Sequence, residues 1–156
     1  MSELLDIYLQ ENGKGGHEDL GFQVHGLTAD RVFDSYYFAL AVEPLDTIEA
    51  VRECLAQYLE QWGRSIERMG DGEARILPID LSDQYTGCLS VIEDGQSLSL
   101  EYGISMTEGW AISVNKPEQH FCGVRDFRVD TPEPLVVDKT FFLRSLFQCS
   151  KRLRGL

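Results

Sequence analysis

The chain has 156 residues, of which 43% are hydrophobic, and it carries a net charge of −12 at neutral pH. This length fits one domain, and this apolar share is enough for a core, so a disordered chain is excluded. We therefore expect one globular domain over 1–156, as a monomer or homodimer. The negative charge would repel bare nucleic acid and anionic membranes, so the expected partner is a basic protein.

The first elements are predicted to form a hairpin. Apolar and polar residues alternate over residues 5–10 and again over 22–25, which is the period of half-buried strands. Between them lies ENGKGGHED, residues 11–19, whose glycines suit a connecting loop. The stretch YYFALAV, residues 36–42, is apolar throughout and predicts a further, central strand.

The strongest pattern in the chain is that of an amphipathic helix. Apolar residues recur at steps of three and four from Ile48 to Met69, which places them on one face. Asp46 or Thr47 is placed to cap its N-terminus, and Gly70 is placed to end it. We therefore expect about six helical turns in this segment.

The chain then returns to the strand period. A strand over residues 77–81 contains Pro78, which predicts an edge or bulged position. An Asp-Gly turn at Gly95 predicts a hairpin, and alternation over 110–114 predicts a third strand that completes a meander. Residues 124–129 are expected to form a last strand.

A proline-rich connector, DTPEPL, leads to a C-terminal helix capped by Asp138 or Thr140. Together the elements predict an α+β fold. It consists of an antiparallel sheet of hairpins and a meander, one long amphipathic helix packed on a face, and a short C-terminal helix.

The stretch ENGKGGHED has three interpretations. A phosphate loop would need GxxxxGK[ST] before a helix, but a strand is expected here. A metal site could use His17, Glu18, Asp19 and His25, although no HxH or HExxH spacing is present. A mobile hairpin loop suits the glycines and charges best, so we expect no metal and no cofactor.

Two further patterns could carry chemistry. His120 and Cys122 could supply a base and a thiol, with Asp126 as the orienting group, or Cys122 could be a buried hydrophobe beside a loop histidine. Acidic pairs such as Asp80/Asp83 could act as in glycosidases, but solvated turn residues are the simpler interpretation. No GxSxG motif is present.

Four scattered cysteines without a CxxC pair indicate a reducing compartment, and the N-terminus MSELLDIYLQ lacks the basic start of a signal peptide. A cytoplasmic protein is therefore expected. Residues 1–110 carry 21 acidic and 6 basic side chains, whereas residues 111–156 carry 5 and 8. The acidic part is either an ordinary solvated surface or a recognition face for a basic protein.

Aromatic residues favour the second interpretation, because tyrosine and tryptophan anchors surrounded by acids are typical of binding surfaces. The alternative is a sheet core with tyrosines at its rim. The aromatic set consists of Tyr36, Tyr37, Phe38, Tyr85, Tyr102 and Trp110.

In its general features the chain resembles small bacterial immunity proteins, the cytosolic antidotes to interbacterial toxins. The features that carry the resemblance are the single α+β domain, the acidic residues 1–110, the meander with its Glu-Asp-Gly turn and the lack of a catalytic motif. The resemblance implies a non-enzymatic protein that occludes the basic active site of a toxin. A small-molecule-binding domain, with its ligand between sheet and long helix, and an enzyme using His120 and Cys122 are the alternatives. On exposed turns and the outward side of the meander, the predicted partner-binding residues are Asp80, Asp83, Tyr85, Glu93, Asp94, Glu101, Glu108 and Trp110.

Overall fold

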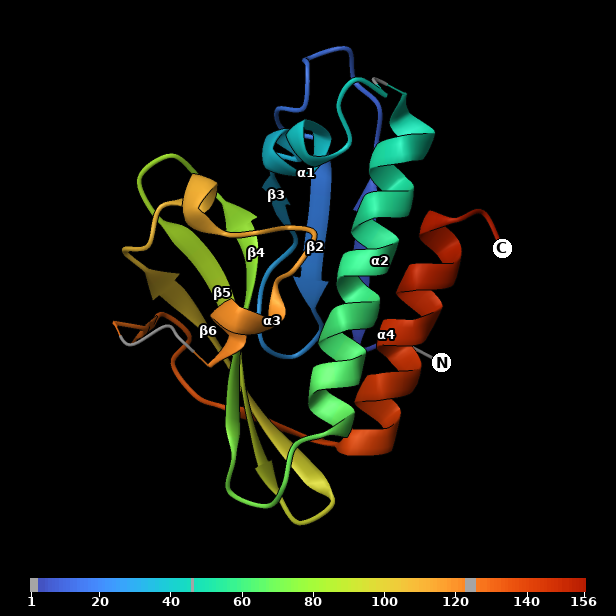
Figure 1. Cartoon of the computed structure of the whole chain (residues 1–156). Helices are drawn as coiled ribbons and strands as arrows, with labels where there is room; N and C mark the ends of the chain where they lie inside the picture. The colour runs from blue at the N-terminus through green and yellow to red at the C-terminus, as the bar shows by residue number, and fades with distance from the viewer. Residues whose placement is uncertain (1–2, 46, 123–125) are drawn as a thin grey trace.

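A computed structural model of the chain, shown in Figure 1, describes residues 3–45, 47–122 and 126–156. The fold is α+β, as predicted, but it contains two antiparallel sheets where one was expected. The N-terminal sheet has the order β1-β2-β3, and residues 10–19 join its first two strands as the predicted hairpin. Its strands are β1 (Leu5–Leu9), β2 (Leu20–Val24) and β3 (Arg31–Phe33).

The stretch YYFALAV is a helix, so the predicted central strand is wrong. Helix α1 covers Tyr36–Ala41 and directs the fully buried Phe38 onto Tyr58, with ring centroids 5.0 Å apart. Leu40 remains 40% exposed on its outer side. An apolar run of this length fits a strand and a short helix equally well, and here the contact with Tyr58 selects the helix.

The long amphipathic helix is confirmed as α2 (Ile48–Glu67), and Thr47 caps it by accepting a hydrogen bond from Ala50 N. Asp46, the other predicted cap, lies outside the described residues. The apolar face of α2 contacts both sheets and the C-terminal helix. Tyr58 Oη donates to Pro78 O at 2.5 Å in the second sheet, and Arg52 donates to Leu9 O at 3.0 Å in the first.

The second sheet has the order β4-β5-β6-β7, and β8 also pairs with β6. The edge position of β4 and its bulge beside Pro78 are as predicted, because a proline cannot donate to a neighbouring strand. The Asp-Gly hairpin joins β5 to β6. The five strands are β4 (Ala74–Leu81), β5 (Thr86–Asp94), β6 (Ser97–Ser105), β7 (Arg128–Val129) and β8 (Leu135–Asp138).

Two segments after β6 differ from the prediction. Residues 110–114 do not form a strand: a short 3-10 helix, η1 (Gly109–Ala111), is followed by irregular chain in which Ile112 and Val114 are buried. Their alternation therefore reflects burial without strand pairing. A four-residue helix, α3 (Glu118–Phe121), follows, and β8 begins inside the predicted connector. Of the predicted strand 124–129, its first two residues lie outside the described part of the chain.

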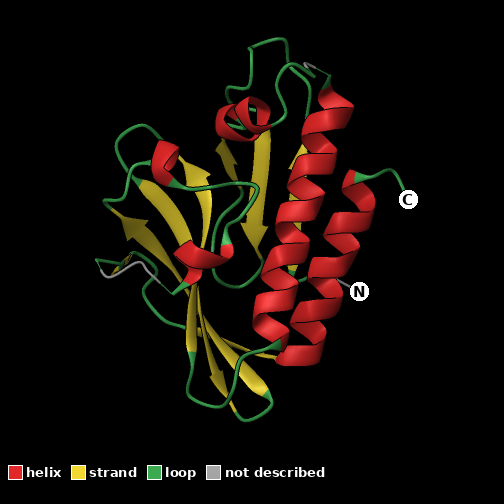
Figure 2. Ribbon diagram, viewed as in Figure 1, coloured by secondary structure: helices red, strands yellow, loops and turns green. Residues whose placement is uncertain are grey.

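The C-terminal helix α4 (Lys139–Leu153) is capped by Asp138, which accepts from Phe141 N, as predicted. Figure 2 shows α2 and α4 side by side, with the N-terminal sheet behind them. Ser145 Oγ accepts from Leu5 N at 2.9 Å, so α4 also covers the outer edge of β1. Among the described residues, no helix is long and apolar enough to cross a membrane.

Candidate functional site

Exposed tyrosines, a tryptophan and acids from three separate segments meet at one end of the second sheet. We call this surface the acidic aromatic face. Tyr37 Oη donates to Asp83 Oδ1, which joins α1 to the turn after β4, and Gly109 N donates to Ser82 O at 2.7 Å, which joins η1 to the same turn. The acidic aromatic face consists of Tyr36, Tyr37, Asp83, Tyr85, Glu108 and Trp110.

The turn and η1 approach each other more closely than side chains would allow. A Cβ atom added to Gly109 would lie 2.7 Å from the carbonyl carbon of Leu81 and from the backbone nitrogen of Ser82. Only glycine permits this contact between two stretches of backbone. The position of Trp110, the next residue, is therefore fixed relative to Asp83.

The aromatic residues of this face are open to solvent. Trp110 is 64% exposed and its indole Nε1 donates to the carboxylate of Glu108. Tyr36 is 39% exposed and Tyr85 37%. Large exposed aromatics among acids are the composition of binding surfaces, because such rings lose little conformational entropy when they are covered.

A polar hollow of about 440 Å³ opens within this face. Three rings in contact form one wall: His17 stacks on Tyr36 with centroids 5.5 Å apart, and Tyr36 meets Tyr37 edge to face at 5.4 Å. Among the residues that the structure describes, two carboxylates and no lysine or arginine line the hollow. The lining residues are His17, Asp34, Tyr36, Tyr37, Leu81, Ser82 and Asp83.

Asp34 holds the histidine of this wall in place. Its Oδ2 lies 3.1 Å from His17 Nδ1, and its Oδ1 accepts from Glu18 N at 2.8 Å. The second bond stabilises Glu18 in the left-handed region, at a φ of 54°. Partial burial acts to raise the pKa of Asp34, but the hydrogen bonds from Glu18 and His17 outweigh it and leave the pKa lowered. Asp34 is therefore a carboxylate at neutral pH.

The bond between Tyr37 and Asp83 is the other polar contact of the hollow. It raises the pKa of Tyr37 to about 12, first because the phenol donates to the Asp83 carboxylate and further because of partial burial and the charge of Asp83. The phenol thus stays protonated and keeps donating. Asp83 Oδ2 has no hydrogen-bond donor within residues 3–45, 47–122 and 126–156, so this oxygen is available to a ligand.

Asp80 pairs with Gly87 and is half-buried, so it is not one of the exposed acids that the sequence predicts. Burial raises its pKa to about 6, the charge of Asp34 adds to the rise, and Tyr85 and Arg31 oppose it. Its side chain packs closely against Gly87.

Two other predicted residues lie at the opposite end of the hairpin. Strand β5 has nine residues, so its ends are about 30 Å apart at ~3.3 Å per residue. Glu93 is only 6% exposed and forms an ion pair with Lys139, so its predicted place on an exposed turn is wrong. Asp94 is exposed, and Glu101 is half-buried in β6 opposite Ser90. The structure therefore brings together four residues of the predicted set, Asp83, Tyr85, Glu108 and Trp110. It places Glu93, Asp94 and Glu101 away from them.

The aromatic set of the sequence also divides. Tyr102 and Phe38 are 1% and 0% exposed, and Tyr102 packs between the sheets, with its ring centroid 5.7 Å from that of Phe22. They belong to the core. His17 and Asp34 were not predicted to meet, because they are 17 residues apart with strand β2 and strand β3 between them.

The loop ENGKGGHED joins β1 to β2, as the hairpin prediction requires, and it makes hydrogen bonds within itself and to Ser35. Asn12 Nδ2 donates to His17 O at 2.9 Å and to Glu18 O at 3.0 Å, while Asp19 accepts from Ser35 N at 3.0 Å. Asp19 is buried, and the Glu18 carboxylate accepts from Lys14 Nζ at 2.6 Å. Within the described part of the chain, no three metal-ligating side chains converge.

The glycines of this loop face the N-terminus of α2 after all, across a cavity of about 290 Å³. Within residues 3–45, 47–122 and 126–156, its lining includes the carboxylates Glu11, Asp19 and Glu43 and no lysine or arginine. Like charges would repel a phosphate there, even though the helix terminus would attract it.

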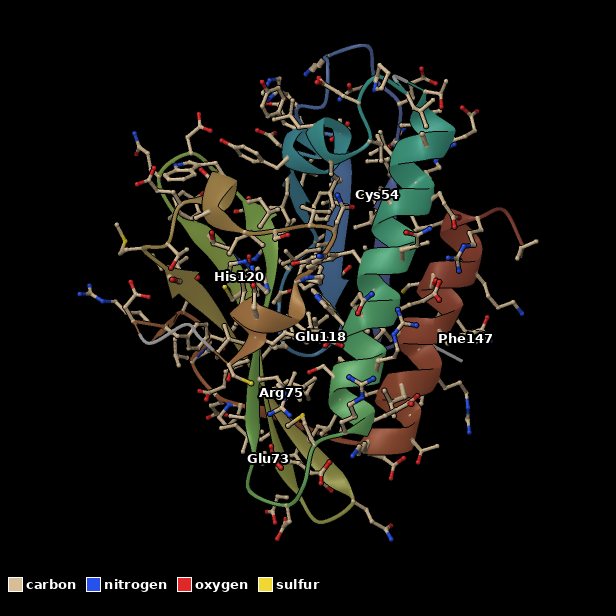
Figure 3. The ribbon with its side chains drawn as sticks, in the orientation of Figure 1. Cys54, Glu73, Arg75, Glu118, His120 and Phe147 are labelled. Carbon is tan, nitrogen blue, oxygen red and sulfur yellow. The ribbon has the colours of Figure 1, made fainter. Side chains whose placement is uncertain are left out.

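The candidate thiol site does not assemble as a hydrogen-bonded set among the described residues. Figure 3 shows His120 at the short helix α3, where its Nε2 accepts from Ser113 N at 3.0 Å. Burial lowers the pKa of His120. Asp126, the predicted orienting group, accepts from Ser105 Oγ at 2.7 Å and from Met106 N at 2.9 Å instead.

The acidic aromatic face thus depends on contacts between segments far apart in the chain: α1, the turn after β4, and η1. No short motif in the sequence corresponds to it. The four predicted residues were found because exposed turns concentrate acids and aromatics, whereas the two tyrosines of α1 were only part of a broader aromatic set. Comparison with known proteins gives no match to a family model, to a curated protein or to a solved structure.

Proposed function

We propose that this protein is a non-enzymatic binding protein that recognises a basic protein through its acidic aromatic face. The observation that carries the proposal is the exposure of Trp110, Tyr85 and Tyr36 beside Asp83 and Glu108 on one surface. Aromatic anchors supply contact area, and surrounding charges supply steering and selectivity. The overall charge of −12 acts in the same direction, because it attracts basic partners at a distance.

The partner class follows from the resemblance to immunity proteins. A toxin whose active site binds nucleic acid or nucleotides presents a basic surface, and an acidic surface with aromatic anchors is complementary to it. We propose that the face covers such an active site and thereby inhibits the toxin. In this role the protein needs no catalytic group and no cofactor of its own.

The test is affinity capture from a lysate of the cells that produce the protein. The wild type is compared with Glu108→Lys, which reverses a charge on the face, and with Asp94→Lys, which reverses an equally exposed charge at the far end of the hairpin. We expect one basic protein in stoichiometric amount, retained by the Asp94 variant and lost or strongly weakened in the Glu108 variant.

Two outcomes would count against the proposal. Capture of no stoichiometric partner by the wild type would remove the binding role. Equal loss in both variants would show that only overall charge matters, and loss in the Asp94 variant alone would place the partner at the other end of the molecule. Inhibition of the captured partner's own activity would then test the immunity role.

A further inference from the structure

The hollow within the acidic aromatic face has the chemistry of a receptor for one cationic side chain. Its volume of about 440 Å³ is within the range of about 300–1,000 Å³ that is usual for ligand pockets. Its lining combines aromatic rings, two carboxylates and the apolar side chain of Leu81. Such a lining disfavours an anion, because its two carboxylates would repel one and none of the described lining residues is a lysine or arginine.

The rings and the carboxylates act on different parts of a bound cation. The contacting rings of His17, Tyr36 and Tyr37 provide faces and edges on which a planar cation can stack. Asp83 offers Oδ2, which lacks a donor among the described residues, while its Oδ1 is held by Tyr37. Leu81 can pack against an aliphatic stem, as long cationic side chains require.

We propose that this hollow receives an arginine side chain of the basic partner. Arginine fits better than lysine, because a planar guanidinium both stacks on aromatic rings and pairs with a carboxylate through a fork of donors, whereas an ammonium is a strongly hydrated point charge. The inference rests on the proposed function, since it names the partner group that the face anchors.

The carboxylate oxygens are held in place before the ligand arrives. Tyr37 fixes one oxygen of Asp83, and Glu18 N and His17 hold both oxygens of Asp34. A preorganised site loses less conformational freedom on binding than one whose side chains must first be ordered. These hydrogen bonds therefore favour the bound geometry.

The test uses three short peptides, acetyl-Gly-Xaa-Gly-amide, in which Xaa is arginine, lysine or the uncharged analogue citrulline. Each is titrated at low ionic strength into the isotope-labelled protein, and backbone amide shifts are followed by NMR. We expect saturable shifts at the amides of Tyr36, Tyr37, Ser82 and Asp83 with the arginine peptide. Lysine should bind about three- to fivefold more weakly, and citrulline should give no saturable shift.

Three variants distinguish a built site from general attraction. Asp83→Asn keeps an acceptor for Tyr37 and removes the charge, so it should weaken binding of the arginine peptide by roughly tenfold. Asp94→Asn removes the same charge at the far end of the hairpin and should change affinity by less than about twofold, because the attraction between exposed charges in water is small at that distance. Tyr37→Phe removes the bond that holds Asp83 Oδ1 and should weaken binding of the arginine peptide by about two- to threefold, because the carboxylate must then be ordered on binding.

The outcomes separate this inference from the proposed function. Arginine and lysine peptides of equal affinity, or equal weakening by Asp83→Asn and Asp94→Asn, would overturn the arginine site. If the arginine peptide binds at the hollow but Asp83→Asn captures the partner as well as the wild type does, the arginine site is confirmed and the hollow lies outside the partner interface. An unchanged amide spectrum of each variant without peptide shows that the fold is intact.

Discussion

The two ends of the β5–β6 hairpin carry the same kinds of acidic residue and use them differently. At the tip, Glu93 is buried against Lys139, and Asp71 Oδ1 accepts from Gly95 N at 2.7 Å. At the other end, Asp83 and Glu108 are exposed and their hydrogen-bond partners are aromatic side chains.

The difference shows that an acidic composition alone does not locate a binding surface. Acids at the tip join β5 to α4 and to the turn after α2, so they stabilise the fold. Acids at the open end are bonded to Tyr37 and Trp110, side chains that can be covered by a partner without loss of a backbone contact. Substitutions at the tip should therefore change stability, and substitutions at the open end should change binding.

The largest effect is expected at the tip. Glu93→Gln removes the charge that pairs with Lys139 and should lower the free energy of unfolding by about 2–3 kcal/mol, because the partly buried Lys139 is left without its partner charge. Urea unfolding measures it. Asp94→Asn, one residue further on and exposed, should stay within about 0.5 kcal/mol. A similar loss in both variants would contradict the distinction.

At the open end the expected effect is on binding. Trp110→Ala should weaken binding of the captured partner by at least about 2 kcal/mol, because it removes a large exposed anchor. Its free energy of unfolding should change by less than about 0.5 kcal/mol. Phe147, 60% exposed on α4, is a matched control (Figure 3). Phe147→Ala should leave the partner's affinity intact, and a comparable loss there would show that α4 belongs to the interface.

A smaller, pH-dependent effect is expected at Asp80, which pairs with Gly87 near the open end of the hairpin. Because its pKa is raised from 3.8 to about 6, the folded state holds this proton more tightly than the unfolded chain. Stability from this group is therefore lost as the pH rises through that interval. Allowing for partial exposure, the loss is about 1–2 kcal/mol.

Asp80→Asn should lack this loss. Its stability relative to the wild type should grow between pH 3.8 and about 6 and then stay constant, as measured by urea unfolding across the pH range. A stability difference that does not vary with pH would show that Asp80 titrates normally.

The sequence predicts the elements whose patterns are long or carry a specific turn. The stripe from Ile48 to Met69 repeats over many turns, and the Asp-Gly hairpin is fixed by local geometry. The strands predicted over 36–42 and 110–114 are wrong. Neither a short apolar run nor three alternating apolar residues distinguishes a strand from a short helix or from irregular buried chain. In both, contacts with distant residues decide the conformation. The division into two sheets likewise depends on pairing between strands, which no local pattern encodes.

The site was predictable only in part, for a related reason. Exposed turns with acids and aromatics pointed to Asp83, Tyr85, Glu108 and Trp110, which do lie together. The same reasoning predicts that Glu93 is exposed, because it lies next to a turn. Its side chain is buried instead, because it pairs with Lys139 on α4. His17 and Asp34 joined the site through the tertiary fold alone.

The close contact of Gly109 with Leu81 and Ser82 has a consequence for how this surface could be copied or lost. Because two stretches of backbone touch there, the spacing between Trp110 and Asp83 is set by main chain and survives most side-chain changes. Neither stretch holds that spacing by itself. A linear fragment of either one should fail as a mimic, and an antibody raised against the surface should recognise only folded protein.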